Sequence, residues 1–381
     1  MQVALIAFVL SSCLVMEMWI PITAMHENQN IIARYRRSRS NLPVSPAPQI
    51  RPSEHPILQW NMPAFMFSAN EGARRDRRCA AAENQLESVP SFLAKLGNVA
   101  QRARKIIHLT MYDCELSMLE LKLAEMGPVV FKFVIGEALM SNSNKPRRAC
   151  FHDALANSSI VQYYMDIGKI EYLFMDNKLE GGKFVYWEAE VHYKNQLAGP
   201  VANMTDLNDE DLILFSDLDE IVARPYLQAM SERMTLFPDG GGIRLALRWT
   251  YYGFQWVNPG LTVVNAVVTW GDLKDRCGLK VNDIRLNLCG GENHKQTWGI
   301  VGWHCSWCIP TPQFVEKLNK TSASEMNVPS NRGLRFLSQQ RDNGLWFMTQ
   351  TPNACFSERG DDKSFSPALA EFSGHGIRKV A

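Results

Sequence analysis

Apolar and polar positions divide residues 105–135 into short segments of different period. The apolar run Ile106 to Leu109 is typical of a strand, and leucine and methionine then recur at helical spacing at positions 116, 119, 123 and 126. We expect Asp113 to cap this helix at its start and Gly127-Pro128 to end it. A second apolar run, 129–135, follows directly. This stretch therefore predicts a strand, a helix and another strand.

The same alternation continues along the chain. Residues 168–176 and the apolar run 212–215 are typical of strands, and helices are expected over 183–197 and from Pro225 to Met234. Strands that alternate with helices imply crossover connections and a mainly parallel sheet. Beyond residue 242, three β-rich segments follow at 242–249, 251–256 and 261–270. We predict an α/β fold, a mostly parallel sheet flanked by helices, with a β-rich second half.

An acidic cluster follows the run 212–215 directly. Asp217, Asp219 and Glu220 stand at the carboxyl end of the predicted strand, and residues two apart on an extended chain point to the same side. Ligands bind at the carboxyl ends of strands in open α/β sheets. Mg²⁺ and Mn²⁺ prefer oxygen ligands and often bridge carboxylate and phosphate. The cluster predicts a metal and diphosphate site; a polar turn that caps the next helix is the alternative.

Residues 301–308 form a second unusual segment, with two tryptophans, a histidine and a Cys-x-x-Cys pair. A zinc half-site would need a second Cys/His pair, and a thioredoxin-like motif would belong near the first strand–helix unit. His304 could instead join Asp219 as a metal ligand, with Trp303 and Trp307 forming a wall for a sugar ring of the acceptor. The alternative is a core histidine between packed indoles, with a local disulfide.

The N-terminus changes the picture of where the protein works. Residues 3–22 are almost entirely apolar, close to the ~20 residues that span a bilayer. We interpret residues 1–24 as a signal anchor or a cleaved signal peptide; both place the remainder in the secretory lumen. Prolines and arginines without a sustained period predict a stem over 25–97. A catalytic domain over 98–355 and a polar tail over 356–381 complete the expected organisation.

Cysteines and sequons agree with a lumenal location. Eight cysteines lie beyond the apolar segment, an even number that fits disulfides in an oxidising compartment, although their pairing cannot be deduced. Three N-glycosylation sequons begin at Asn157, Asn203 and Asn319. The net charge of +1 favours no nucleic-acid partner.

Together these segments resemble a known family. Residues 217–221 followed by 302–308 resemble the motifs of the β-1,4-mannosyl-glycoprotein 4-β-N-acetylglucosaminyltransferases of glycosyltransferase family 17, which add the bisecting GlcNAc to N-glycans. Further blocks at 115–123, 133–138, 145–146, 251–256, 283–285 and 341–347 are similar, so the resemblance covers roughly residues 105–350. Lys194 stands where an arginine is expected, and the C-terminal helical segment of the family is not recognisable after Pro352.

The resemblance implies a GT-A type fold, UDP-GlcNAc as donor, Mn²⁺ or Mg²⁺ as cofactor and a Golgi membrane or secreted location. It also implies inverting transfer of GlcNAc, in β-1,4 linkage, to the β-linked mannose of a glycoprotein N-glycan. A metal held by Asp217, Asp219 and His304 would neutralise charge on the leaving diphosphate, with Asp217 also near the ribose of the donor. Another UDP-sugar or acceptor, or a glycan-binding protein without activity, are the alternatives.

Several further residues are candidates for a role in transfer. An inverting transfer needs a carboxylate base, and Asp283 and Glu292 are candidates because they precede the Trp-His motif; both could also be ordinary surface acids. Arg285 could bind the donor diphosphate or pair with Glu220. Glu137, at a strand end, could hold the uracil or ribose of the donor, or belong to a buried network.

Overall fold

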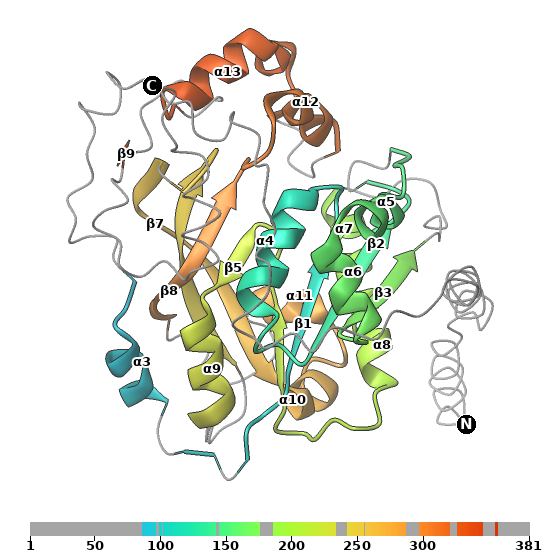
Figure 1. The fold of residues 1–381 in the computed structure, drawn as a ribbon, viewed down its shortest axis with the longest axis vertical. Coiled ribbons are helices and arrows are strands. Elements are labelled where there is room, and N and C mark those ends of the chain that lie inside the picture. The colour runs from blue at the N-terminus through green and yellow to red at the C-terminus, as the bar shows by residue number, and fades with distance from the viewer. Residues whose placement is uncertain are drawn as a thin grey trace, which may run out of the picture. The chain divides into compact units, whose positions relative to one another are not determined.

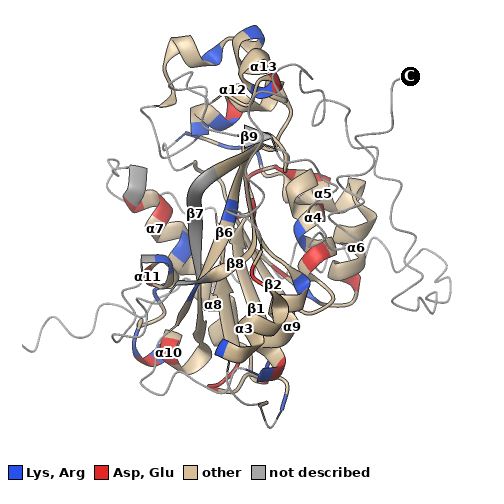
Figure 2. Ribbon diagram, turned by 90° about the vertical axis from the view of Figure 1, so that its left-hand side faces the viewer, with Lys and Arg blue, Asp and Glu red and all other residues tan. Residues whose placement is uncertain are grey.

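One sheet runs through the described part of the chain, and helices cover both of its faces (Figures 1 and 2). The computed structural model describes residues 86–96, 99–100, 102–141, 145–175, 186–233, 242–254, 256–286, 297–320, 326–345 and 355–356. These residues all belong to one unit, residues 57–381. The predicted leader (1–24) lies outside the described residues, as do nearly all of the predicted stem and tail.

The elements follow in the order α3 (Val89–Lys95), β1 (Ile106–Met111), α4 (Leu116–Met126), β2 (Lys132–Ala138), α5 (Phe151–Asn157), α6 (Ser159–Asp166), β3 (Ile170–Met175), α7 (Tyr186–Gln196), α8 (Ala198–Ala202), β4 (Leu212–Phe215), β5 (Glu220–Val222), α9 (Arg224–Arg233), β6 (Ile243–Tyr251), β7 (Trp256–Thr269), α10 (Trp270–Asp275), α11 (Val281–Leu286), β8 (Thr297–Ser306), α12 (Thr311–Lys320), the 3₁₀ helix η4 (Pro329–Arg332), α13 (Leu334–Asp342) and β9 (Cys355–Phe356).

The first half of the sheet is parallel, as predicted. Strands β3, β2, β1 and β4 lie side by side in that order, each pair parallel. Helices α4, α6 and α9 lie on one face and α7 and α11 on the other (Figure 2). Because both faces are covered, all four side chains of β4 are buried. This explains why the apolar run 212–215 shows no polar alternation.

The second half of the sheet is mixed. Strand β7 pairs antiparallel with β4 and with β6, while β8 lies parallel to β6 and antiparallel to β5. The α/β class, the flanking helices and the β-rich second half are confirmed. The parallel arrangement holds for the half that contains β1 and β4. Among the later strands, β6 ends at Tyr251 and β7 begins at Trp256, a connection short enough to join antiparallel neighbours.

Two details differ from the sequence-based expectations. Asp113 does not cap α4, because the residue before the helix is Glu115 and Asp113 pairs with Arg147 at 2.7 Å. Helix α3 lies within the predicted stem, where Phe92 packs edge-on against Tyr226 of α9, with ring centroids 5.1 Å apart. Seven helical residues are too few to show a clear period in sequence, which is why this helix was not predicted.

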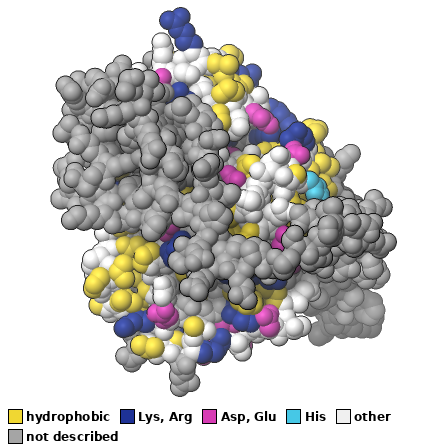
Figure 3. Space-filling view, viewed as in Figure 1, with side chains coloured by type: hydrophobic (Ala, Val, Ile, Leu, Met, Phe, Trp, Pro, Cys, Tyr) yellow, Lys and Arg dark blue, Asp and Glu magenta, His cyan; other side chains and the backbone are white. Residues whose placement is uncertain are grey.

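Figure 3 shows basic and acidic side chains interspersed over the face that it draws. None of the helices in the described ranges is long and apolar enough to cross a membrane. The apolar segment 3–22, on which the anchor prediction depends, lies outside those ranges.

Candidate active site

The acidic cluster is a turn between two buried strands. Strand β4 ends at Phe215 and β5 begins at Glu220, and the backbone N–H of Glu220 donates to the carbonyl of Asp217 at 3.0 Å. The Glu220 side chain is fully buried and accepts a hydrogen bond from the Asp217 N–H at 2.8 Å. This turn, residues 216–220, is called the acidic turn below. It presents Asp217 and Asp219 at the carboxyl edge of β4.

The Trp-His motif lies against the acidic turn. It forms the end of β8. In the antiparallel pairing with β5, Glu220 stands opposite His304, and the Cys305 N–H donates to the Asp219 carbonyl at 2.8 Å. His304 Nε2 is 3.6 Å from Asp219 Oδ1. The two motifs, about 80 residues apart in the chain, therefore meet as predicted.

Asp217 is surrounded by cations from one face of the sheet. Arg285 of α11 contacts Asp217 Oδ2, and Lys194 Nζ of α7 is 3.3 Å from Oδ1. Burial would raise the pKa of Asp217, but the charges of Lys194 and Arg285 outweigh it and hold the pKa well below its usual range. Lys194 thus supplies a point charge where the family resemblance predicts an arginine.

Arg285 also links two residues of the acidic turn, Asp217 and Glu220. Its second terminal nitrogen is 3.2 Å from Glu220 Oε1, so that one guanidinium pairs with both Asp217 and Glu220. Burial raises the pKa of Glu220, and Arg285 opposes this shift. The structural alternative for Arg285, an ion pair with Glu220, is therefore confirmed, and the predicted diphosphate role is not the one that the contacts show.

Asp219 is approached from the opposite side by a residue that sequence reasoning missed. Lys317 of α12 places Nζ 3.5 Å from Asp219 Oδ2 and 2.7 Å from Glu115 Oε1. Burial would raise the pKa of Asp219, but Lys317 and then His304 lower it well below its usual range. Nothing in the local pattern around Lys317 indicates this role, because α12 returns to the acidic turn only in the folded chain.

A buried lysine donates hydrogen bonds to the acidic turn. Lys122 of α4 donates to the Asp217 carbonyl at 2.6 Å and to Ser216 Oγ at 2.8 Å, and its Nζ is 3.4 Å from His108 Nε2. Burial lowers the pKa of Lys122 to about 7, and burial and then Lys122 hold that of His108 well below its usual value. The sequence feature that could have indicated this role is a lysine on the apolar face of a predicted helix, between Leu119 and Met126.

The two predicted sugar-stacking tryptophans are core residues. Trp303 is 0% exposed and Trp307 is 7% exposed, so the prediction that they form an acceptor wall is wrong. Strand β8 lies between β5 and β6, which buries Trp303. Trp249 of β6 is half-buried instead and stacks on the His304 ring, with centroids 5.5 Å apart.

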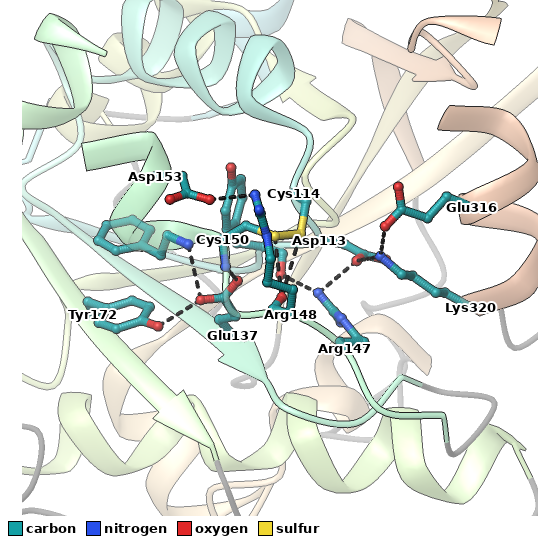
Figure 4. The surroundings of a disulfide bond; sticks show 12 residues. Asp113, Cys114, Glu137, Arg147, Arg148, Cys150, Asp153, Tyr172, Glu316 and Lys320 are labelled. Atoms are coloured by element: carbon teal, nitrogen blue, oxygen red, sulfur yellow. Dashed lines mark hydrogen bonds and ion pairs between the residues drawn. A yellow bond between two sulfur atoms is a disulfide. The ribbon is translucent and has the colours of Figure 1, made fainter. Parts of the chain in front are cut away.

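Glu137 belongs to a buried network, the second of the two alternatives. It is fully buried at the end of β2 and accepts hydrogen bonds from the Cys150 N–H at 2.6 Å, the Phe151 N–H at 3.2 Å and the Tyr172 hydroxyl at 2.7 Å (Figure 4). Its carboxylate therefore satisfies the backbone donors at the start of α5. These contacts and the full burial of Glu137 support the network alternative over a donor-binding role.

Five cysteines of the described residues are disulfide-bonded. Cys305 is linked to Cys308 and Cys114 to Cys150, and Cys277 is also disulfide-bonded. The local disulfide predicted as one alternative for the Trp-His motif is confirmed, and thiolate ligation of zinc by this pair is excluded. The lumenal interpretation of the cysteine count is supported, because such bonds persist in oxidising compartments.

Of the two candidate bases, Asp283 lies among the described residues. It is on α11, two residues before Arg285. Its role as the base stays a prediction. Glu292 lies outside the described residues.

The family model described as "Glycosyltransferase family 17" matches residues 93–326, a range that contains both the acidic turn and the Trp-His motif. The chain belongs to glycosyltransferase family 17. The family resemblance drawn from the two motifs is thereby confirmed.

Three relatives carry the description beta-1,4-mannosyl-glycoprotein 4-beta-N-acetylglucosaminyltransferase. The proteins of Rattus norvegicus, Mus musculus and Homo sapiens are each 27% identical to this family 17 chain over 272 residues, which is 64% of the chain. The match covers 48% of the rat and mouse proteins and 49% of the human one. The chain therefore spans about half the length of the curated relatives it matches.

Two solved structures resemble this family 17 chain only weakly. A 4-diphosphocytidyl-2C-methyl-D-erythritol synthase aligns with a TM-score of 0.33 at 10% identity, over 57% of this chain and 99% of that one. An active-site mutant of LgtC aligns with a TM-score of 0.26 at 12% identity, over 71% of this chain and 95% of that one. Both scores are too low to indicate a shared fold.

The predicted metal ligands form an open site rather than a closed one. Among the described residues, the one group of three potential ligands whose atoms all lie within 4.8 Å of one another is Cys114, Glu137 and Cys150, and these cysteines are in a disulfide. Asp217 is paired with Lys194 and Arg285. Asp219 and His304 remain as a carboxylate and an imidazole whose buried Nδ1 has no hydrogen-bond partner. Two such ligands fit a cation that shares its shell with phosphate.

The three sequons occupy different positions in this family 17 chain. Asn157 is the exposed last residue of α5, and Asn203 is the exposed C-cap of α8. Asn319 lies half-buried in α12 and accepts a hydrogen bond from Asn327 at 3.3 Å. Glycosylation at these positions stays a prediction, with Asn157 and Asn203 the more accessible.

Proposed function

We propose that this family 17 chain is an N-acetylglucosaminyltransferase of GT-A type. It transfers GlcNAc from UDP-GlcNAc, with inversion, to the β-linked mannose of a glycoprotein N-glycan core in β-1,4 linkage. The observation that carries the proposal is the meeting of Asp219 with His304 at the carboxyl edge of β4. The descriptions of its relatives support GlcNAc as the transferred sugar and a mannosyl-glycoprotein as the acceptor.

The acidic turn is the proposed diphosphate end of the donor site. Asp219 and His304 would hold Mn²⁺ or Mg²⁺, with Asp217 excluded from the shell by Lys194 and Arg285. When bound, the cation supplies Lewis-acid neutralisation of the charge that develops on the diphosphate. Two residues of the chain orient this site. Arg285 pairs with both Asp217 and Glu220 of the acidic turn, and Lys122 of α4 hydrogen-bonds to the backbone of that turn.

A base for the acceptor hydroxyl completes the proposal. Inversion requires a carboxylate within hydrogen-bonding distance of that hydroxyl. Asp283 and Glu292 remain our candidates, because Asp283 lies on α11, which supplies Arg285, and Glu292 lies in the sequence between α11 and β8, which supplies His304. Both neighbouring elements reach the acidic turn.

We further propose that the enzyme works in the secretory pathway, in the Golgi membrane or as a secreted form. The disulfides of the described residues support an oxidising compartment. The apolar segment 3–22 supports either a membrane anchor or a cleaved leader.

Turnover of UDP-GlcNAc with a defined N-glycan tests the proposal. We expect UDP release that depends on Mn²⁺ and stops when EDTA is added, and a product whose linkage analysis shows β-1,4 GlcNAc on the β-linked mannose. Glycan binding without any UDP release would contradict the transferase proposal and indicate a binding protein. Release with another UDP-sugar would retain the fold and change the specificity.

A further inference from the structure

Lys317 reaches the acidic turn but has no part in the function proposed so far. Its Nζ is 2.7 Å from Glu115 Oε1 and 3.5 Å from Asp219 Oδ2. One ammonium group therefore bridges the residue before α4 and the proposed metal ligand. The Lys317 side chain is 24% exposed, so part of it borders solvent.

The Trp-His motif itself directs Lys317 to this place. Helix α12 begins at Thr311, three residues after Cys308, whose disulfide to Cys305 closes the end of β8. The Trp307 ring lies 5.4 Å from Lys317 Nζ and supports it as a cation–π partner. Figure 1 shows α12 beyond one end of the sheet, near α4. The chain segment that begins with the Trp-His motif thus supplies both His304 and Lys317 to Asp219.

The ammonium group of Lys317 lowers the pKa of two carboxylates, Glu115 and Asp219. Burial raises the pKa of Glu115 while Lys317 lowers it, and Lys317 is the largest influence that keeps Asp219 ionised against burial. A divalent cation held by Asp219 and His304 would stand beside Lys317. Like charges a few ångströms apart in a buried site repel strongly, so the contact between Lys317 and Asp219 would weaken.

We propose that Lys317 exchanges partners: it pairs with Asp219 in the protein without nucleotide, and with the diphosphate oxygens of the nucleotide once cation and nucleotide are bound. This inference rests on the proposed function. Glu115, the nearer partner, holds the ammonium through the exchange. The flexible four-carbon stem and three donors of lysine suit such a movement, which the planar fork of an arginine would constrain more.

The exchange predicts two effects of opposite sign in the Lys317→Met variant. Affinity for Mn²⁺ alone should rise about threefold to tenfold, because a competing like charge is removed from Asp219. Affinity for UDP at saturating Mn²⁺ should fall about tenfold, because one charge-assisted hydrogen bond to the diphosphate is lost. Isothermal titration calorimetry measures both constants on the purified full chain, and the electron paramagnetic resonance signal of Mn²⁺ checks the first.

Lys320→Met is the matched control. Lys320 lies three residues further along α12, and its ion pairs are with Glu316 at 2.5 Å and Asp113 at 3.9 Å rather than with Asp219. Both binding constants should remain as in the unmodified chain. Lys317→Arg keeps the positive charge and should retain most of the UDP affinity. If Lys317 acted only through helix packing, its charge would not determine the UDP affinity.

Two results would overturn the inference while the proposed function stands. A Lys317→Met variant that loses affinity for both Mn²⁺ and UDP would show that Lys317 only maintains the structure of the site. A variant that changes neither constant would show that Lys317 contacts neither. An unmodified chain that binds no UDP in the presence of Mn²⁺ would contradict the proposed function, and this inference with it.

Discussion

Asp219 is the residue on which the proposed chemistry depends most directly. Its two carboxylate oxygens face His304 at 3.6 Å and Lys317 at 3.5 Å, and both neighbours lower its pKa. Asp217 has a similar environment but is paired with Lys194 and Arg285. Of the two aspartates, only Asp219 contacts the imidazole that can share a cation.

Asp219→Ala should therefore abolish transfer without unfolding the protein. We expect kcat/KM for UDP-GlcNAc to fall at least ~100-fold, the scale on which a group that stabilises developing charge contributes. Steady-state kinetics measure the loss, and circular dichroism measures the fold. Asp209→Ala is the control, because Asp209 is an exposed acid paired with Lys274 away from the acidic turn. Unchanged UDP release in Asp219→Ala would remove the metal assignment.

Lys122 should make stability depend on pH. Burial lowers its pKa to about 7 in the folded protein, whereas a lysine in the unfolded chain titrates near ~10.4. Between these values the unfolded state binds a proton that the native state lacks, so the contribution of Lys122 to stability rises with pH across this window. Below pH 7 both states are protonated and the contribution no longer changes.

The comparison of Lys122→Met with the unmodified chain isolates this effect. The difference in unfolding free energy, unmodified minus variant, should increase from pH 7 to pH 9.5 in guanidinium titrations. Exposed Lys145→Met should give a difference that stays flat. A flat difference for Lys122→Met as well would show that Lys122 titrates normally in the folded protein.

At the scale of elements, the close approach of β5 and β8 positions His304. Gly302 stands opposite Val222 in the pairing, and a Cβ added at Gly302 would lie 2.1 Å from the Ile221 carbonyl oxygen. The Ile221 carbonyl oxygen belongs to the backbone, so it cannot move aside as the end of a flexible side chain can. A glycine is therefore required two residues before His304.

Gly302→Ala should separate the two strands. We expect a loss of about 1–3 kcal/mol in unfolding free energy, as for other overpacked sites, and a lower affinity for Mn²⁺. Gly199→Ala in α8 is the control, because no atom lies within 4 Å of an added Cβ there. Chemical denaturation measures both variants. Gly302→Ala with unchanged stability would contradict the pairing of β5 with β8.

At the scale of the whole molecule, the two disulfides should stabilise it unequally. Cys114–Cys150 spans 36 residues and Cys305–Cys308 spans 3. In the chain-entropy model these loops correspond to about 4 and about 2 kcal/mol, respectively. Paired Cys→Ser variants, compared by guanidinium unfolding, should show the larger loss for Cys114/Cys150. The reverse order would indicate that local packing of the Trp-His motif matters more than loop length.

The acidic turn is enclosed from three directions in the folded molecule. Lys194 and Arg285 come from helices on one face of the sheet, Lys122 comes from the other face, and Lys317 comes from α12. Figure 2 shows α4 on the opposite side of the sheet from α7 and α11. No single segment of sequence displays this arrangement.

Local pattern was sufficient for the strands and for the two motifs. Apolar runs that must be buried on both faces predict β1 and β4, and the acidic residues after β4 must then lie at its carboxyl edge. These predictions depend on neighbours in sequence and on the geometry of a single element. The contact of Asp219 with His304 was one of the alternatives that the sequence left open, and the pairing of β5 with β8 decided it.

Partners distant in sequence decided the rest. Glu137 and Trp303 are conspicuous in sequence, yet one caps α5 and the other is enclosed between β5 and β6. Lys122 and Lys317 are inconspicuous, yet both contact the acidic turn. Burial and charge pairing arise when the sheet brings remote elements together, so composition and spacing along the chain could not reveal them.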